Sequence, residues 1–550
     1  MKQSNLFLAT AAASLLLPDK GAAQVILDRA DPTITEQALP TLDAPEPSRR
    51  AAPSLAAPST AVFLPALKVT PQAILVAASE LPAANFAGII MRYVGRELDR
   101  AELSSLVSDV AAEARRAGYP FATASIEPQD LAGGVLRVHV EEGRIDAVRV
   151  IGATSTRADR LLSRMLVTGR PVRKADLERA LALVGDLPGV TVQESRLSRE
   201  QGFSIMLVTI AKDRASGYAQ LDNRGSDEVG PLRSTLLGSV REVLQDGDEL
   251  AVLLAHTAPQ LSEFVFLRGR YMMPVGLDGG ALSVAGSYGR SQPGALLKGN
   301  KIVGESVDTA ILVSQPLTRT RTASVVAALE LRHIETEQRA RGGTFRRDRL
   351  DTLTATLDGL AAIGGGRARG QLAFAVGLPL EGVTRRGDPL RSRDDGDARF
   401  ITLGFTADWT RALSHRATLL LAASGQVASR ALLATAEIGV GGPTFGRGYD
   451  FAERTGDDGL TGSAELRYDT GKLADRLIER SHLYVFADGG RVTNRGLQKT
   501  GGTLASAGVG TRLGLGRFEG MAELAFPLNK DRFDTGDKRP RISLRLSRVF

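Results

Sequence analysis

The pattern of apolar and polar residues changes twice along the chain, and each part predicts a different kind of structure. After about Lys212, segments of about ten residues alternate apolar and polar positions, and turn-forming residues separate them. In one such segment Leu460 and Leu466 lie on one face while Glu465 and Arg467 lie on the other. This alternation is typical of strands that have one apolar and one polar face.

About sixteen segments of this kind follow one another, with starts near Gly217, Leu232, Asp248, Ser262, Gly280, Gly304, Arg321, Leu350, Arg369, Arg399, Arg416, Leu460, His482, Gly502, Arg517 and Pro540. A soluble sandwich would rarely need so many strands. A closed barrel in lipid needs an even number of them, because every backbone group is then paired and the polar faces line a wet lumen. We therefore expect an all-β, 16-stranded antiparallel transmembrane barrel over 214–550, with the final Phe550 as its C-terminal barrel signal.

Helical spacing replaces the alternation between about Val62 and Asp213, in two consecutive units of β-α-α-β-β order. In the first unit (62–142) the pattern predicts an extended Val62 to Val69, helices at about Asn85 to Leu98 and Glu102 to Ala117, and strands at Phe121 to Ile126 and Val135 to Val140. In the second (143–213) it predicts an extended Ile145 to Ile151, helices at about Arg157 to Leu166 and Arg173 to Val184, and strands at Val190 to Leu197 and Phe203 to Ile210. Two α+β domains therefore precede the barrel.

The N-terminus carries the features of a secretory signal peptide over residues 1–23. Lys2 supplies a positive start, Leu6 to Leu17 an apolar stretch, and Gly21-Ala22-Ala23 a small-residue cleavage site. Residues 24–61 are rich in Pro, Ala and Ser, so we expect a linker there that buries no core. Export and the absence of cysteine leave stability to the hydrogen-bonded sheet.

Composition and motifs argue against most other function classes. The net charge is +7, but its cations are spread along the chain, so a nucleic-acid partner is not expected. The five histidines lack metal-ligand spacing, and no nucleophile elbow is present. The glycine-rich stretches that resemble phosphate loops are not followed by a helix. We therefore expect neither an enzyme nor a cofactor or metal.

Two segments stand out from the strand pattern. Gly441 to Asp450 places Arg447 among glycines in the longest gap between strands, about 430–459. In the strand that begins near His482, alternation directs Phe486, Asp488 and Gly490 to the lumen. Arg447, on a loop folded into the barrel, would then meet Asp488 in a desolvated ion pair. The alternative, an exposed loop cation and a hydrated wall carboxylate, stays equally open on chemistry alone.

These segments resemble the two motifs of the TpsB transporters (ShlB/FhaC/HecB family) of two-partner secretion, relatives of BamA. The loop motif of that family is an aliphatic residue followed by Arg, Gly and an aromatic residue. Here Gly446 replaces the aliphatic residue, and Arg447, Gly448 and Tyr449 match. The strand motif FxDxG is matched in full by Phe486 to Gly490, and the two α+β units resemble polypeptide-transport-associated (POTRA) domains.

The resemblance implies an outer-membrane transporter of a Gram-negative bacterium with periplasmic POTRA domains. Such a protein captures an unfolded TpsA-type exoprotein, for example a haemolysin or adhesin, and passes it through the barrel without ATP. It also implies contacts with outer-membrane lipid, and with the barrel assembly machinery and periplasmic chaperones during biogenesis. In this interpretation Arg447 and Asp488 form a latch between loop and wall, while Gly446, Gly448 and Tyr449 shape the loop tip.

Three questions remain open on the sequence. An insertase of the BamA or TamA type is the main alternative, although only two POTRA-like units are found, and a passive porin or a surface adhesin is a weaker one. An N-terminal plug helix is doubtful, because Pro32 and Pro40 closely bracket Thr33 to Leu39. The identity of the client is not encoded in any recognisable motif.

Overall fold

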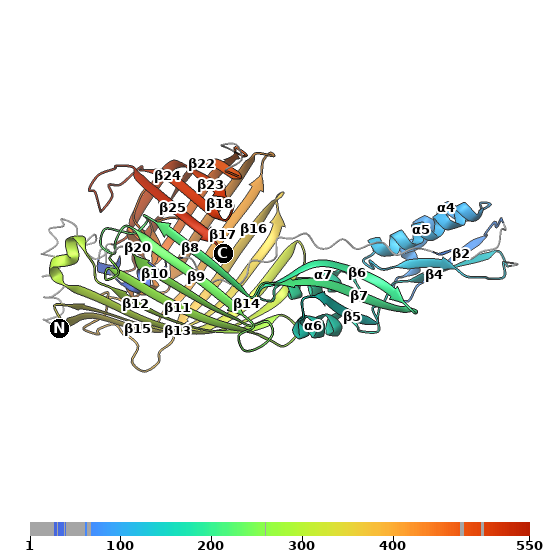
Figure 1. The fold of residues 1–550 in the computed structure, drawn as a ribbon, viewed down its shortest axis with the longest axis horizontal. Coiled ribbons are helices and arrows are strands. Elements are labelled where there is room, and N and C mark those ends of the chain that lie inside the picture. Colours follow the sequence, from blue (N-terminus) through green and yellow to red (C-terminus); the bar gives the residue numbers. More distant parts are fainter. Residues whose placement is uncertain are drawn as a thin grey trace.

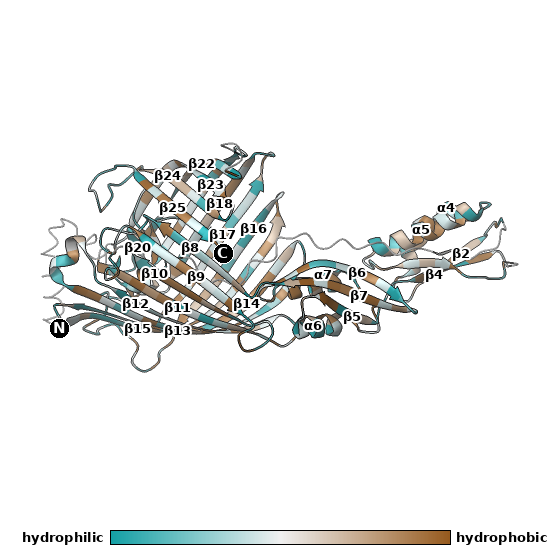
Figure 2. Cartoon of the chain, viewed as in Figure 1, coloured by the Kyte–Doolittle hydropathy of each residue, from teal (hydrophilic) through white to brown (hydrophobic). Residues whose placement is uncertain are grey.

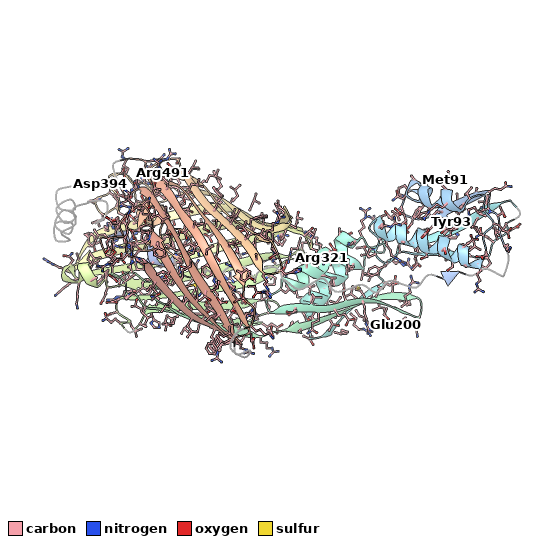
Figure 3. All side chains as sticks on the ribbon, turned by 90° about the horizontal axis from the view of Figure 1, so that it is seen from above. Met91, Tyr93, Glu200, Arg321, Asp394 and Arg491 are labelled. Carbon is pink, nitrogen blue, oxygen red and sulfur yellow. The ribbon has the colours of Figure 1, made fainter. Side chains whose placement is uncertain are left out.

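The computed structural model describes residues 27–29, 31–37, 39, 61–62, 68–131, 133–258, 260–472, 478–496 and 500–550. A barrel forms one end of the molecule, and two α/β units extend in a row from it (Figure 1). Figure 3 labels Arg321 at the end of the barrel beside these units and Asp394 and Arg491 at the opposite end. The expected signal peptide lies outside the described residues.

The barrel has sixteen strands, as the alternation predicts. They are β8 (Ala215–Asp222), β9 (Arg233–Arg241), β10 (Glu249–Thr257), β11 (Phe264–Val275), β12 (Gly280–Ser291), β13 (Ile302–Arg319), β14 (Ala323–Ala340), β15 (Gly343–Ile363), β16 (Gly366–Gly377), β17 (Ile401–Ala412), β18 (Ala417–Ala428), β21 (Asp458–Asp469), β22 (Arg480–Thr493), β23 (Gly502–Leu515), β24 (Phe518–Pro527) and β25 (Arg541–Val549). Each pairs antiparallel with the next, and β25 pairs with β8, so the sheet closes and has no free edge.

Apolar residues recur along the strands of the barrel (Figure 2), and many of their side chains are exposed on its outer face, among them Leu357, Leu372 and Leu403. Leu483 and Val485 of β22 are more than half exposed on that face, whereas Phe486 and Asp488 are buried on the lumen side. No helix among the described residues is long and apolar enough to cross a membrane.

The wall of the barrel is uneven in height. Strands β13 to β15 have 18, 18 and 21 residues, whereas β8, β9, β10 and β25 have only eight or nine. β15 begins at Gly343 and not near Leu350, because the charged residues Arg346 to Arg349 continue the alternation above the apolar band. The closing pair is short, since only Arg545–Val549 align with Tyr218–Asp222.

The first α/β unit contains β2 (Ala73–Ala77), η1 (Ala83–Phe86), α4 (Ala87–Tyr93), α5 (Arg100–Arg116), β3 (Thr123–Ile126) and β4 (Val135–Glu141). A short strand β1 (Ala61–Val62) runs parallel to β3 at the edge of the sheet, whose order is β1-β3-β4-β2. The apolar stripe of α5 packs on this sheet, and a capping box of Asp99 and Glu102 forms at the start of the helix.

Two expectations for this unit were wrong in detail. The sequence pattern missed β2, the strand directly before the helices, because the continuous apolar run Ala73–Ala77 shows no alternation that would mark it as a strand. Of the expected extended range, Val62 belongs to β1 and Val69 forms a single bridge with Leu98. The first helix does not reach Leu98. It ends at Tyr93, where Val94 is extended and Gly95 adopts a φ of +74°.

The second unit repeats the same order with β5 (Ala147–Gly152), α6 (Thr156–Leu166), α7 (Lys174–Gly185), β6 (Val190–Glu200) and β7 (Phe203–Lys212). Its sheet order is β5-β7-β6, with β5 parallel and β6 antiparallel to β7, which matches β2-β4-β3 of the first unit. The pattern repeat in the sequence therefore corresponds to a repeat of topology.

Polar contacts with two turns at the near end of the barrel fix the second unit to it. Asp186 accepts two hydrogen bonds of 2.6 Å from Arg319, at the end of β13. Asp246, in the turn between β9 and β10, accepts from Ser155 Oγ and the Arg157 amide at 2.9 and 2.8 Å and pairs with Lys212 at 2.8 Å. These contacts lower the pKa of Asp246 and raise the pKa of Lys212 against the opposing effect of burial.

The described N-terminal residues correct the expected linker for its first part, up to Leu39, and the doubt about a plug helix there. Residues 27–29, 31–37 and 39, named the plug segment below, lie inside the barrel (Figure 1), and α3 (Pro32–Glu36) forms one helical turn there. Asp31 caps this turn by accepting from the Thr33 amide at 3.0 Å, and Ile34 is 3% exposed. Pro32 occupies a first-turn position, so it starts the helix and does not exclude it.

The junction predicts a defined pH window for the contact between the second unit and the barrel. The lowered pKa of Asp246 adds stability above its ordinary value of 3.8 that is lost as the pH falls through the folded value. The raised pKa of Lys212 adds stability below 10.5 that is lost as the pH rises through the folded value. Spin labels on engineered cysteines in α6 and on the barrel should give one narrow distance distribution at pH 7.

Asp246→Asn should broaden that distribution at pH 7. The matched control is Asp278→Asn in the neighbouring turn, because the Arg164–Asp278 pair spans 3.9 Å and both side chains are more than 60% exposed. Equal broadening by the two variants would contradict a specific role of Asp246.

Candidate functional site

The loop between β18 and β21, residues 429–457, folds into the lumen and carries the predicted loop motif. It contains η3 (Ala434–Ala436) and a small hairpin of β19 (Ile438–Val440) and β20 (Arg454–Gly456), which lies against β22 and β23. Between these two strands the chain turns at Gly441 to Asp450, where the Gly441 amide donates to Phe445 O at 2.8 Å. The hairpin therefore presents the motif to the barrel wall.

Arg447 reaches three carboxylates of the wall. Its Nη1 donates to Glu465 Oε2 at 2.7 Å and to Glu523 Oε2 at 3.2 Å. Its Nε lies 3.0 Å from Asp488 Oδ2, an ion-pair contact without hydrogen-bond alignment. The guanidinium also lies over the Phe486 ring, with its carbon 4.1 Å from the centroid. The side chain is 9% exposed, so this cation is held in a largely dry site.

Asp488 holds the loop mainly through the backbone. Its Oδ1 accepts from the amides of Gly446 and Arg447 at 2.9 and 3.1 Å and also from Ser506 Oγ. Charge-assisted bonds of this kind are stronger than neutral ones, and two adjacent donors fix the orientation of the turn. The predicted pair is therefore close in space, and the carboxylate recognises the shape of the loop as well as its cation.

Backbone conformation and close packing account for the other residues of the two motifs. Gly446 has a φ of +87°, a conformation that favours glycine. A Cβ on Gly448 would lie 3.0 Å from Pro527 N and 3.1 Å from Ser506 Cβ, so the loop touches the wall there. Tyr449 is 1% exposed and donates to Lys530 O at 3.1 Å. A Cβ on Gly490 would lie 2.6 Å from Thr461 Cγ2, so this glycine serves the close packing of β21 on β22.

Sequence reasoning missed the other residues of the site, chiefly Glu465, Glu523, Ser506 and Tyr484. Alternation directs Glu465 to the lumen, but only the strand register brings it opposite Phe486. Tyr484 donates to Glu523 at 3.0 Å, across two strand interfaces. The sequence indicates which carboxylates near the motif face the lumen. It does not indicate the stagger of the strands, which decides which of these carboxylates meet.

The carboxylates around Arg447 have further cationic partners. Glu523 accepts from Arg224 at 2.7 Å, and Glu465 from Arg467 Nε at 2.6 Å. Arg512 lies 3.5 Å from Glu465. Glu465 and Glu523 each keep an arginine if Arg447 withdraws, which reduces the charge left unpaired by movement of the loop.

Asp450, directly after the loop motif, connects three parts of the protein. It accepts from Arg29 of the plug segment at 3.0 Å and pairs with Arg541 at the start of β25. Arg29 also donates to Glu228 at 3.2 Å, in the loop after β8. Asp450 is 1% exposed. The plug segment, the loop tip and both strands of the closing pair therefore meet at one buried charge cluster.

A second buried arginine joins the loops at the end far from the α/β units. Arg393, between β16 and β17, pairs with Glu437 and donates to Asp457 Oδ1 at 2.6 Å, and its side chain is fully buried. Asp457 also accepts from the amides of Leu432 and Arg495 at 2.7 and 2.6 Å. This cluster holds the inward loop at its base, whereas Arg447 holds it at its tip.

Fold and site together define a class. A closed 16-stranded barrel, an inward loop ion-paired to its wall, and POTRA-type units on one side of it characterise outer-membrane transporters of polypeptides. Over the described ranges, no group of three or more His, Asp or Glu side chains is arranged to hold a metal ion.

The comparisons with known proteins agree with this class. The family model for the haemolysin secretion/activation protein ShlB/FhaC/HecB matches residues 203–513, and that for the ShlB-type POTRA domain matches residues 72–143. The chain belongs to the ShlB/FhaC/HecB family. It is therefore an outer-membrane secretion transporter with periplasmic POTRA domains, and not an insertase of the BamA type.

Individual relatives are distant but cover most of the chain. The heme/hemopexin transporter protein HuxB of Haemophilus influenzae (strain 86-028NP) is 23% identical over 419 residues, 74% of each chain. The outer membrane transporter CdiB of Dickeya dadantii is 22% identical over 421 residues, 73% of this chain and 72% of that protein. The solved structure of CdiB from Escherichia coli is similar with a TM-score of 0.71 at 19% identity, over 94% of this chain and 95% of that one, which shows the shared fold.

The Arg393 cluster gives a test of the loop base. Arg393→Ala leaves Glu437 and Asp457 buried without their cation, which costs about 3 kcal/mol or more of local stability. Amide exchange at Leu432, whose N–H bonds to Asp457, should then rise on the order of a hundredfold. The control Arg430→Ala removes a pair with Asp397 in which Arg430 is 52% exposed, and it should change exchange by less than about fivefold. Equal exchange in both variants would show that the cluster does not hold the loop.

Proposed function

We propose that the two POTRA units capture an unfolded exoprotein in the periplasm and that the barrel passes it to the cell surface. In this proposal Arg447 and Asp488 keep the inward loop in a conformation that is competent for transport. The observation that carries this proposal is the position of Arg447, which is held by three wall carboxylates in the lumen. Burial of a cation and its carboxylate partners costs free energy. Such a cluster is useful where the loop must occupy one defined place.

Capture would use main-chain pairing. An unfolded client has unpaired amides and carbonyls, and an open sheet edge offers it a strand partner. In the first unit β1 adds to the edge strand β3 in this manner, although β1 belongs to the same chain. In the second unit the corresponding edge strand β6 pairs only with β7 among the described strands.

Passage requires that the lumen be cleared. The plug segment lies in the lumen and shares Asp450 with the loop tip, so its departure would remove Arg29 from that carboxylate. Asp450 would keep Arg541 as a partner. Folding of the client outside the cell would supply direction without nucleotide hydrolysis.

The loop contact can be tested by export. Arg447→Ala should leave the barrel inserted but lower client export at least about tenfold, because three carboxylates lose their common cation. Arg447→Lys should give an intermediate loss, since an ammonium cannot reproduce the planar contacts. Client in the medium is measured at equal barrel abundance, which heat-modifiable mobility reports. Undiminished export by Arg447→Ala would refute the latch.

Two further variants sharpen this test. Arg349→Ala removes an ion pair to Glu335 on the outer face of β15 and should leave export unchanged. Exchange of the two latch residues, Arg447→Asp with Asp488→Arg, is expected to fail, because a carboxylate at position 447 would face Glu465 and Glu523. Asp488→Asn, which keeps an acceptor for the two amides, should lose less export than Arg447→Ala.

A further inference from the structure

The plug segment contacts the lumen wall through carboxylates at two levels. Asp28 accepts from Arg346 Nη1 of β15 at 2.9 Å, and Glu36 accepts from Arg268 Nη1 of β11 at 2.6 Å. Arg332 of β14 donates from Nε to Asp308 of β13 at 2.8 Å and lies 4.0 Å from the same Glu36 oxygen. Asp28 and Glu36 are eight positions apart, so the segment presents acidic side chains along its path through the barrel.

These wall arginines are built into the lumen. Arg346 is 4% exposed and is oriented by Gln338 Oε1 and Ser392 O at 3.2 and 2.9 Å. Arg268 and Arg332 are 27% and 30% exposed, so water reaches that level. A buried guanidinium stays charged, and removal of Asp28 would leave Arg346 without its carboxylate. Departure of the plug segment takes the paired carboxylates away from Arg268 and Arg346, while Arg332 beside Arg268 keeps Asp308. The sites at Arg268 and Arg346 therefore favour another anion.

The opposite wall adds cations nearer the α/β units. Arg467, Arg512 and Arg545 face the lumen of β21, β23 and β25, and their side chains are between 20% and 30% exposed. They lie two to four residues along their strands from the latch level, toward the end that adjoins the POTRA units. A chain that enters from that end meets these arginines first.

We infer that the lumen binds the acidic side chains of an extended polypeptide, and that a client displaces the plug segment by placing Asp or Glu at Arg268 and Arg332 and then at Arg346. This rests on the proposed function, and it specifies the chemistry of the client. The plug segment is itself the precedent, since its described residues include three acidic and one basic side chain.

The exchange can be measured on the full chain, which contains no cysteine. Thr35→Cys places one thiol in the plug segment, where Thr35 is 6% exposed and donates to Arg29 O at 3.1 Å. The protein is reconstituted in lipid vesicles at low ionic strength, and the rate of maleimide labelling reports departure of the segment. The probes are three soluble peptides of equal length, Gly-Ser repeats that carry glutamate, lysine or no charge.

The glutamate peptide should raise the labelling rate about tenfold over the lysine and uncharged peptides, and salt should reduce the difference. Arg268→Gln with Arg332→Gln should raise the basal rate and abolish most of the preference. Arg349→Gln, on the outer face of the barrel, should keep the preference for the glutamate peptide.

Equal rates with all three peptides, or faster labelling with the lysine peptide, would overturn the inference. A full preference in the double variant would overturn the assignment to Arg268 and Arg332. If that variant does not form a heat-modifiable barrel, Arg268→Gln alone takes its place with the same criterion. Export assays test the proposed function separately, because a transporter of non-acidic clients would pass them and fail this experiment.

Discussion

A strand in lipid must pair each of its backbone N–H and C=O groups with another strand, and this requirement governs the whole molecule. It closes β25 onto β8 and forces one apolar and one polar face on every strand. The polar faces then enclose a lumen from which lipid is excluded. Charged side chains in that lumen are stable only with partners, so ion pairs hold the inward loop and the plug segment to the wall. Small apolar clusters add to these contacts, through Leu432 and Val440 of the loop and Leu39 of the plug segment.

The charges of the lumen form a connected arrangement. Arg447 neutralises a carboxylate cluster that also has Arg224, Arg467 and Arg512 as partners, and Asp450 joins the loop tip to Arg29 and Arg541. Most carboxylates here have more than one cation. Removal of one mobile element therefore shifts partners within the cluster and isolates few charges. Such sharing allows the loop tip to be well ordered and still be released at moderate cost.

Much of this was predictable from the sequence, and the limit has a physical origin. Alternation in segments such as Leu460 to Tyr468 depends on each strand alone, so it gave the strand number and the lumen face of Asp488. The register between strands depends on their stagger around the barrel, which no single strand encodes. Glu465 and Glu523 could therefore be directed to the lumen but not brought to Arg447. The plug segment shows the same limit, because Asp28 is held by Arg346, 318 residues away.

The tall and the short sides of the barrel wall make different contacts. The tall strands β13 to β15 carry two of the plug contacts, through Arg332 and Arg346, and β13 also holds the second α/β unit through Arg319. The short strands β8 and β25 meet in few residue pairs and adjoin the Asp450 cluster through Glu228 and Arg541. Rigid docking on one side and a weakly paired seam on the other mean that movement of the loop tip would act first on the seam. The charge cluster at Asp450 is thus placed where the departure of the plug segment can be transmitted to the least paired part of the barrel.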